Sequence, residues 1–204
     1  MVIGVSLSIF SSCQKHVENI DTPIDQYQHL NSLKNTPKNN FITVQKVTLG
    51  KRLFFDPVLS KNKELSCGSC HDPSLAFSDG VKTSSIGHSR KPLGRNSPAL
   101  FNLAWHSDFF WDGGKTSLEN QAFGPLRSED EMASNLDSII LRLKTDSIYI
   151  NLFNDAFDDG ISLSNLVKAI ASYERTITSF SSKYDDYKKG MAGFTESEKH
   201  GETV

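Results

Sequence analysis

The chain has 204 residues, of which 37% are hydrophobic and 23% are charged, and these proportions are ordinary for a soluble globular protein. The formal net charge of -2 argues against a nucleic-acid partner, because domains that bind nucleic acids normally carry an excess of basic residues. No apolar run in the sequence is long enough to span a bilayer.

The N-terminal residues have the pattern of an export signal. The first ten, MVIGVSLSIF, are mostly apolar and uncharged, and Cys13 stands where this run gives way to polar residues. This pattern predicts a signal and lipoprotein segment over 1–13, with Cys13 as the lipid-bearing residue, although no Lys or Arg precedes the run. The alternative is a buried N-terminal strand. We expect a periplasmic or cell-envelope protein, tethered to a membrane face by one acylated cysteine.

Residues 14–40 are polar and include Pro23 and Pro37, which predicts a tether with one weak helix at most. The globular part is expected at 41–190. Apolar residues at helical spacing predict its first helix from Val44 to Leu53, followed by a stop at Phe54–Pro57.

The remainder of the chain has long loops and helices. The segment from Leu75 to Pro98 is rich in Gly, Ser and Pro, which predicts a long structured loop. Beyond Ser117 the pattern is helical, and two helical faces are visible: Leu136, Ile139, Ile140 and Leu143, then Ile161, Leu163, Leu166, Ile170, Tyr173 and Ile177. Because no β alternation of any length is present, we expect a mostly α fold.

A Cys-x-x-Cys-His motif stands at Cys67-Gly68-Ser69-Cys70-His71. Positions i and i+3 share one face of a short helix, so both thiols reach the two vinyl groups of a haem and His71 supplies an axial ligand. The alternatives are a redox dithiol and half of a zinc site. The sequence contains no second Cys pair to complete a zinc site, and no βαβ pattern surrounds the motif. The motif therefore predicts one covalently attached haem c.

An ordered series of short motifs surrounds the haem motif. In chain order they are LGKRLFFDPVLS (49–60), SCGSCHDP (66–73), AFSDG (76–80), SIGH (85–88), GRNSP (94–98), FWDGG (110–114), LENQA (118–122) and EM (131–132). From about Phe41 to the C-terminus the chain closely resembles the N-terminal domain of the bacterial di-haem cytochrome c peroxidases, and the related enzyme that matures methylamine dehydrogenase is similar. The resemblance implies a cytochrome c-like haem domain with long loops.

The resemblance also implies roles for four residues around the iron. His71 matches the proximal ligand of the peroxidatic haem, and His88 matches a distal ligand that leaves when the enzyme is activated. Gln121 and Glu131 match the pair in the distal pocket, where Glu131 moves a proton between the oxygens of peroxide and Gln121 orients the peroxide. The alternative for Glu131 is a solvated glutamate in the acidic run 129–131 at a helix start.

Two further residues have implied roles outside this pocket. Trp111 matches the tryptophan between the two haems, a role compatible with simple core packing. Asn96 matches a side chain that helps bind a calcium ion at the domain interface, and its alternative is a turn or cap before Ser97-Pro98.

The sequence departs from the family in one respect. It has a single Cys-x-x-Cys-His motif, whereas the family enzymes have two haem domains. Residues Phe194–Gly201 resemble the opening of the second domain, so we expect 191–204 to be the start of a truncated domain that carries the second haem. We expect the full-length protein to be a homodimer.

We therefore expect an enzyme that reduces hydrogen peroxide to water with electrons from a small cytochrome c or copper protein. One alternative is a mono-haem electron carrier in which His88 is a permanent ligand. Another is an oxidase that acts on a protein substrate.

Overall fold

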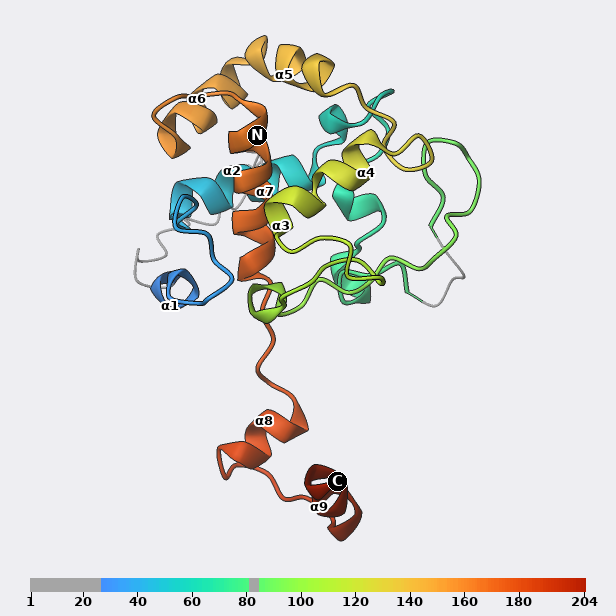
Figure 1. Ribbon diagram of the computed structural model, residues 1–204, viewed down its shortest axis with the longest axis vertical. Coiled ribbons are helices and arrows are strands. Elements are labelled where there is room, and N and C mark those ends of the chain that lie inside the picture. Colours follow the sequence, from blue (N-terminus) through green and yellow to red (C-terminus); the bar gives the residue numbers. More distant parts are fainter. Residues whose placement is uncertain (1–26, 81–84) are drawn as a thin grey trace, which may run out of the picture.

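The computed structural model describes residues 27–80 and 85–204. The predicted signal segment at 1–13, Cys13 included, and residues 14–26 lie outside this part of the chain. Within it the secondary structure is helical, with only isolated β-bridges, which confirms the mostly α fold (Figure 1). The α-helices are α1 (Gln28–Asn31), α2 (Val44–Phe55), α3 (Leu118–Gln121), α4 (Phe123–Arg127), α5 (Leu136–Lys144), α6 (Ser147–Ala156), α7 (Leu163–Thr176), α8 (Lys183–Lys188) and α9 (Glu196–Thr203). None of these helices has the length and apolar character needed to cross a membrane.

Helix α7 is the centre of the body, and helix α2 crosses it (Figure 1). The Ser162 hydroxyl caps α7 by accepting a hydrogen bond from the Asn165 N–H at 3.2 Å. All residues from Asn165 to Arg175 except Lys168 are buried, because neighbouring elements cover the helix on several sides. A helix surrounded in this way fixes the relative positions of everything packed against it.

Helix α2 confirms the predicted first helix and extends it to Phe55. Its N-terminus is capped by the Thr43 hydroxyl, which accepts from the Lys46 N–H. Gly50 faces α7 so closely that an added Cβ would lie 1.9 Å from the Ala169 carbonyl oxygen. The two backbones therefore touch at a point where only glycine fits.

Helices α5 and α6 lie together at one end of α7 (Figure 1). The predicted apolar face of α5 is present, with Ile139 and Leu143 fully buried. On α6, Tyr149 and Phe153 enter the same core.

The chain between 76 and 98 has no helix in its described residues, which agrees with the predicted long loop.

The structure differs from the expected tether in the part that it describes. Residues 27–40 pack against the body, and Leu30, Thr36 and Asn40 are buried. Their polar groups have partners: the Thr36 hydroxyl donates to the Leu30 carbonyl, and the Asn40 amide donates to the Lys168 carbonyl at 3.0 Å. Polar composition predicted exposure here, whereas hydrogen bonding makes burial possible.

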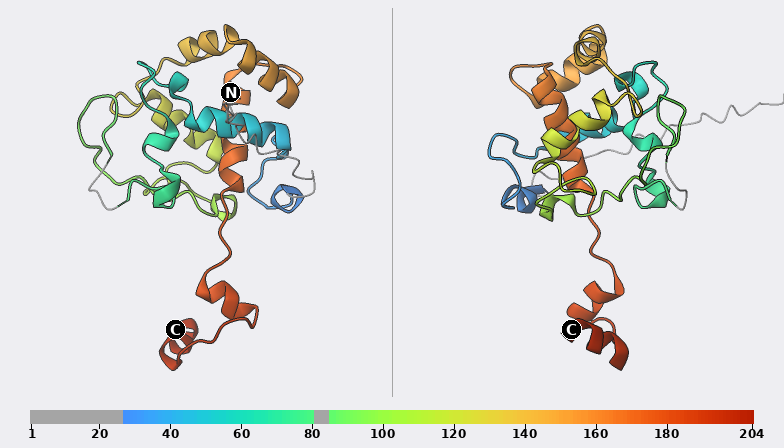
Figure 2. Two further views of the ribbon diagram at one scale, coloured as in Figure 1. Left: turned by 180° about the vertical axis from the view of Figure 1, so that it is seen from behind. Right: turned by 45° about the vertical axis from the view of Figure 1, so that its right-hand side comes forward.

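Helices α8 and α9 project from the body on a single connecting segment (Figure 2). They pack on each other through Tyr187 and Phe194, whose rings stack with centroids 3.9 Å apart, and through an ion pair between Lys183 and Glu198. The expected boundary between 190 and 191 thus falls between two helices that contact each other.

The Gly50 contact gives a direct stability test. Gly50→Ala should lower the free energy of unfolding by about 3 kcal/mol, because overpacking against a backbone carbonyl forces α2 and α7 apart. Gly94→Ala is the matched control, since its added Cβ meets nothing within 4 Å and should change stability by less than about 0.5 kcal/mol. Denaturant unfolding of the haem-loaded protein measures both, and equal stabilities would contradict the close contact.

Candidate haem site

Helix α2 is followed by a short 3₁₀ turn, η2 (Pro57–Leu59), and then by the loop 60–66. The haem-attachment motif comes next and begins with a single 3₁₀ turn, η3 (Cys67–Ser69). Ser66 precedes this turn, and its N–H donates to the Ser69 hydroxyl at 3.0 Å. The His71 N–H then donates to the Cys67 carbonyl at 2.9 Å. The predicted short helix is therefore a tighter turn, which still brings Cys67, Cys70 and His71 to one cavity.

The orientation of His71 is fixed by a backbone carbonyl. Its Nδ1 lies 2.9 Å from the Phe77 oxygen, and because a carbonyl only accepts, Nδ1 carries the proton and Nε2 keeps its lone pair. The carbonyl is turned toward the ring by Ala76 and Phe77, both left-handed with φ of 60° and 53°, a conformation that costs about 1–2 kcal/mol per residue. Burial lowers the pKa of His71, although the Phe77 carbonyl acts to raise it. A neutral imidazole with this tautomer is the usual form of an iron ligand.

A cavity of about 690 Å³, counting the open space at its mouth, lies beside the motif. The residues that line it come from both sides of the body and are Leu65, Ser66, Cys67, Cys70, His71, Gly87, Leu93, Ser97, Gln121, Ala122, Pro125, Leu126, Glu131, Met132, Ile170 and Glu174. The cavity thus brings together five of the residues predicted for the site, which are Cys67, Cys70, His71, Gln121 and Glu131.

The distal pair comes from the segment containing α3 and α4. Gln121 is the last residue of α3, whose Ser117 cap accepts from the Asn120 N–H. Glu131 lies in the turns after α4, where its N–H donates to the Ser128 carbonyl at 3.1 Å. Burial raises the pKa of Glu131 and Asp130 adds to this effect, while a hydrogen bond with Ser128 opposes it. Glu131 is therefore partly buried in the pocket rather than a freely solvated surface residue.

The loop that carries His88 packs directly on the Glu131 segment. The His88 N–H donates to the Glu131 carbonyl at 2.7 Å. At the preceding Gly87, an added Cβ would lie 1.9 Å from the Asp130 carbonyl oxygen, so the approach requires glycine. Nδ1 of His88 is buried and has no hydrogen-bond partner among the described residues, an arrangement that is costly unless a further group binds there.

Trp111 and Asn96 lie outside the cavity. Trp111 is 62% exposed, and its indole N–H donates to the Asn96 carbonyl at 2.8 Å. The Asn96 amide reaches a carboxylate oxygen of Asp79 at 3.3 Å, and the other oxygen accepts from the Ser97 N–H. The structure thus joins these two predicted residues to each other and to Asp79, which sequence reasoning did not single out.

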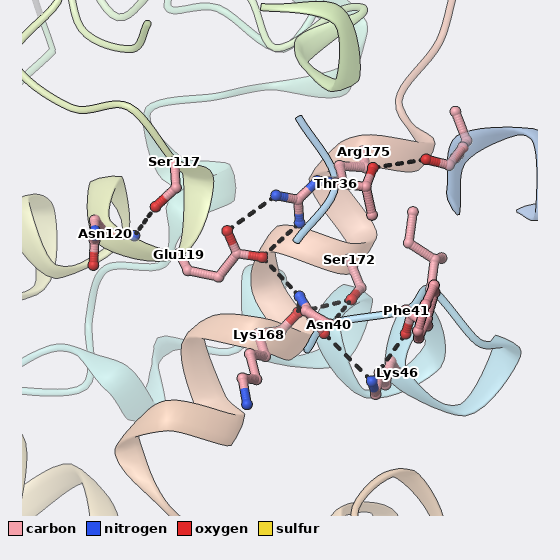
Figure 3. Close-up of polar contacts among 12 residues, drawn as sticks. Thr36, Asn40, Phe41, Lys46, Ser117, Glu119, Asn120, Lys168, Ser172 and Arg175 are labelled. Carbon is pink, nitrogen blue, oxygen red and sulfur yellow. Dashed lines mark hydrogen bonds and ion pairs between the residues drawn. The ribbon is translucent and has the colours of Figure 1, made fainter. Parts of the chain in front are cut away.

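A buried ion pair between α3 and α7 was also missed (Figure 3). The Arg175 guanidinium donates to both oxygens of Glu119, at 2.7 and 3.0 Å, and the Asn40 amide donates to the same carboxylate at 2.8 Å. Burial acts to raise the pKa of Glu119, but the hydrogen bonds and charge of Arg175 hold it below the ordinary value. This pair fixes α3, and therefore Gln121, to α7.

Glu174 was missed as well, although the sequence held a signal for it. Leu166, Ile170 and Glu174 are spaced i, i+4 and i+8, so a carboxyl group follows two apolar residues on one helix face. Glu174 is 6% exposed and lines the cavity.

Removing the buried anion tests the role of the ion pair. Glu119→Ala should destabilise the protein by about 3–5 kcal/mol, because the Arg175 guanidinium, with 1% of its side chain exposed, then has no counter-charge. Glu196→Ala removes the exposed pair with Lys199 and should leave the unfolding midpoint unchanged. Chemical denaturation compares the two, and similar midpoints would show that the buried pair does not hold α3.

A Cys-x-x-Cys-His turn, a neutral axial histidine and a cavity beside them define a c-type haem protein. The cavity and the free thiols of Cys67 and Cys70 that line it fit that group. His88 is not among the residues that line the cavity, although the adjacent Gly87 is.

Comparisons with known proteins give the family. Residues 44–193 match the model of the di-haem cytochrome c peroxidases, and the chain belongs to this family, whose cofactor is haem c. It is 41% identical to methylamine utilization protein MauG of Methylorubrum extorquens over 173 residues, which are 78% of this chain and 49% of that protein. It is 38% identical to cytochrome c551 peroxidase of Pseudomonas aeruginosa, covering 73% of this chain and 44% of that protein.

A solved structure confirms the cytochrome c-like fold. A MauG-like protein associated with microbial copper homeostasis superposes with a TM-score of 0.74 at 35% identity, covering 81% of this chain and 50% of that chain. The chain spans about half the length of the curated relatives it matches.

Proposed function

We propose that the full-length protein is a cytochrome c peroxidase that reduces hydrogen peroxide to water with electrons from a small redox protein. The observation that carries this proposal is the shared cavity, in which Gln121 and Glu131 lie with the haem-attachment motif. Named relatives support it, since cytochrome c peroxidases from several bacteria are 35–38% identical to the chain.

The proposed haem-binding residues are Cys67, Cys70 and His71. Burial raises the pKa of the Cys67 thiol to about 12 and also raises that of Cys70, so both side chains are protonated at neutral pH. Each would form a thioether by net addition of its S–H across a vinyl group of the haem. His71 presents Nε2 to the iron, because Nδ1 donates to Phe77. When bound, the haem supplies the electrons and the iron centre at which peroxide is reduced.

The protein's own contribution is to move a proton. Glu131 accepts a proton from one oxygen of hydrogen peroxide and returns it to the other, which leaves as water. Overall, peroxide takes up two electrons and two protons and gives two waters. Gln121 orients the peroxide by hydrogen bonding. Its position is held by the neighbouring Glu119–Arg175 pair.

His88 is the proposed sixth ligand of the oxidised resting state. Its ring nitrogen is buried without a partner, and its loop is attached to the Glu131 segment by one hydrogen bond. If His88 holds the iron, its release would leave that position free for peroxide. A permanent ligand there would instead give an electron carrier.

An oxidase acting on a protein substrate is the second candidate. The similarity to proteins named for methylamine utilization favours it. Trp111 is exposed and offers a route by which electrons would pass from a protein substrate to the haem. Under either function, we propose a second haem c in a further domain and a calcium site between the domains to which Asn96 contributes. The working protein is a homodimer in the periplasm or cell envelope, with Cys13 as its lipid anchor.

Glu131→Gln tests the peroxidase reaction. Loss of the proton carrier should lower peroxide turnover by about 10²-fold or more in the full-length haem-loaded protein. Glu129→Gln, an exposed neighbour in the same acidic run, is the matched control and should retain turnover. Steady-state rates with a reduced cytochrome measure both. Near-normal turnover in the Glu131 variant would show that this carboxylate is not the proton carrier.

His88→Gly tests the sixth ligand. The oxidised full-length protein should change from low-spin to high-spin ferric haem, because the iron loses a strong nitrogen ligand. The exposed His106 provides the control, and His106→Gly should leave the spectrum unchanged. Electron paramagnetic resonance reports the spin state, and a persistent low-spin signal from this haem would exclude His88 as its ligand.

A further inference from the structure

The haem cavity contains a second carboxyl group that the peroxide reaction does not use. Glu174 lies in the last turn of α7, 6% exposed, and lines the cavity together with Cys67 and Ile170. Its Oε2 is buried and has no hydrogen-bond partner in the described part of the chain. A buried carboxyl oxygen that faces a cofactor pocket without a partner requires an explanation.

The neighbouring charges do not neutralise Glu174. Arg175 is adjacent in sequence, but its guanidinium donates to both oxygens of Glu119. Glu119 on α3 adds a repelling negative charge, and the Cys67 thiol on η3 and the Tyr173 hydroxyl also interact with Glu174. Across the cavity the other ionisable side chains are Glu131, Cys70 and His71, of which haem attachment would leave only Glu131 free to titrate. Glu174 is therefore a deeply buried carboxyl group in the pocket, and no cation forms an ion pair with it among the described residues.

Such a group is protonated near neutral pH. Burial raises the pKa of Glu174 to about 8; Glu119 contributes in the same direction, and Arg175 opposes it. Glu131 is less buried and has Ser128 as a hydrogen-bond partner, so the two carboxyl groups of the pocket have different environments. Different environments give two carboxyl groups different protonation states and roles.

We infer that Glu174 is a redox-linked proton site, whose carboxyl group releases its proton when the haem in this pocket is oxidised and regains it on reduction. This inference rests on the proposed function, since it requires haem in the pocket. Oxidation would remove one electron from the bound haem, with the oxidised form of the small redox protein as the acceptor. The pocket gains one positive charge, which favours the carboxylate, and the Glu174 proton passes to solvent. Reduction reverses both transfers.

The direction of the pH effect follows from this linkage. Where oxidation releases a proton, raising the pH favours the oxidised state, so the reduction potential of the haem falls. One proton per electron gives a limit of about 59 mV per pH unit, the value of a tenfold change for a one-electron couple. Glu174→Gln keeps the size and hydrogen-bonding capacity of the side chain but removes its proton equilibrium.

The experiment measures the potential of this haem from pH 6 to pH 9 in the full-length haem-loaded protein. Wild type should show the falling potential, and Glu174→Gln should show a clearly smaller slope. Glu196→Gln alters an exposed glutamate on α9 and should keep the wild-type slope. Equal slopes in wild type and Glu174→Gln would overturn the inference.

An infrared measurement on wild type does not depend on whether the variant folds. The oxidised-minus-reduced difference spectrum should show loss of a protonated carboxyl band on oxidation, and its absence would contradict the inference. Glu174→Met offers a second variant of similar size. If haem is attached and peroxide turnover is normal while the slopes are equal, only this inference fails. If mass spectrometry finds no haem on the Cys67–His71 peptide, the proposed function fails with it.

Discussion

The backbone contact between α2 and α7 determines where the parts of the haem site lie. Helix α2 leads through η2 to the Cys67–His71 turn, and α7 brings Ile170 and Glu174 to the same cavity. Gly50 allows the two helices to touch, because an added Cβ would overlap the Ala169 carbonyl. The proximal side of the pocket is therefore positioned by a contact between main chains rather than by side chains that could change rotamer.

The distal side is positioned by electrostatics instead. Glu119 on α3 is bound by Arg175 and Asn40, which come from α7 and from the segment before α2. Isolated buried ion pairs add little net stability relative to apolar residues, but their geometry is specific. Here the pair anchors a helix of only four residues, too short to be stable alone, and this helix ends at Gln121.

The sequence places the haem motif, Gln121 and Glu131 at one site because the chemistry of the motif is local and the order of the motifs resembles that of a family. The structure brings these residues to one cavity, and the roles of Gln121 and Glu131 stay predictions. Cys67, Cys70 and His71 lie within five residues, and Gln121 and Glu131 were located by motif order. The helices α2, α5 and α7 followed from apolar spacing. These predictions needed no knowledge of distant contacts.

Glu119, Arg175 and the packed segment 27–40 could not be predicted in the same way. Arg175 and Glu119 are 56 positions apart, and charged residues near helix ends are normally solvated. Asn40 is fully buried only because the carboxylate of Glu119 and a carbonyl of α7 receive its amide protons. Burial of polar residues depends on partners that the local sequence does not reveal.

The close packing of Gly87 against the Asp130 carbonyl couples the movement of two segments. Gly87 packs against the Asp130 carbonyl, and the His88 N–H donates to the Glu131 carbonyl. The segments that carry His88 and Glu131 are therefore coupled. If the proposed release of His88 moves its loop, either the hydrogen bond to the Glu131 carbonyl breaks or the Glu131 segment moves with the loop. Under the proposed function, release of His88 and repositioning of the Glu131 carboxylate would then be a single motion.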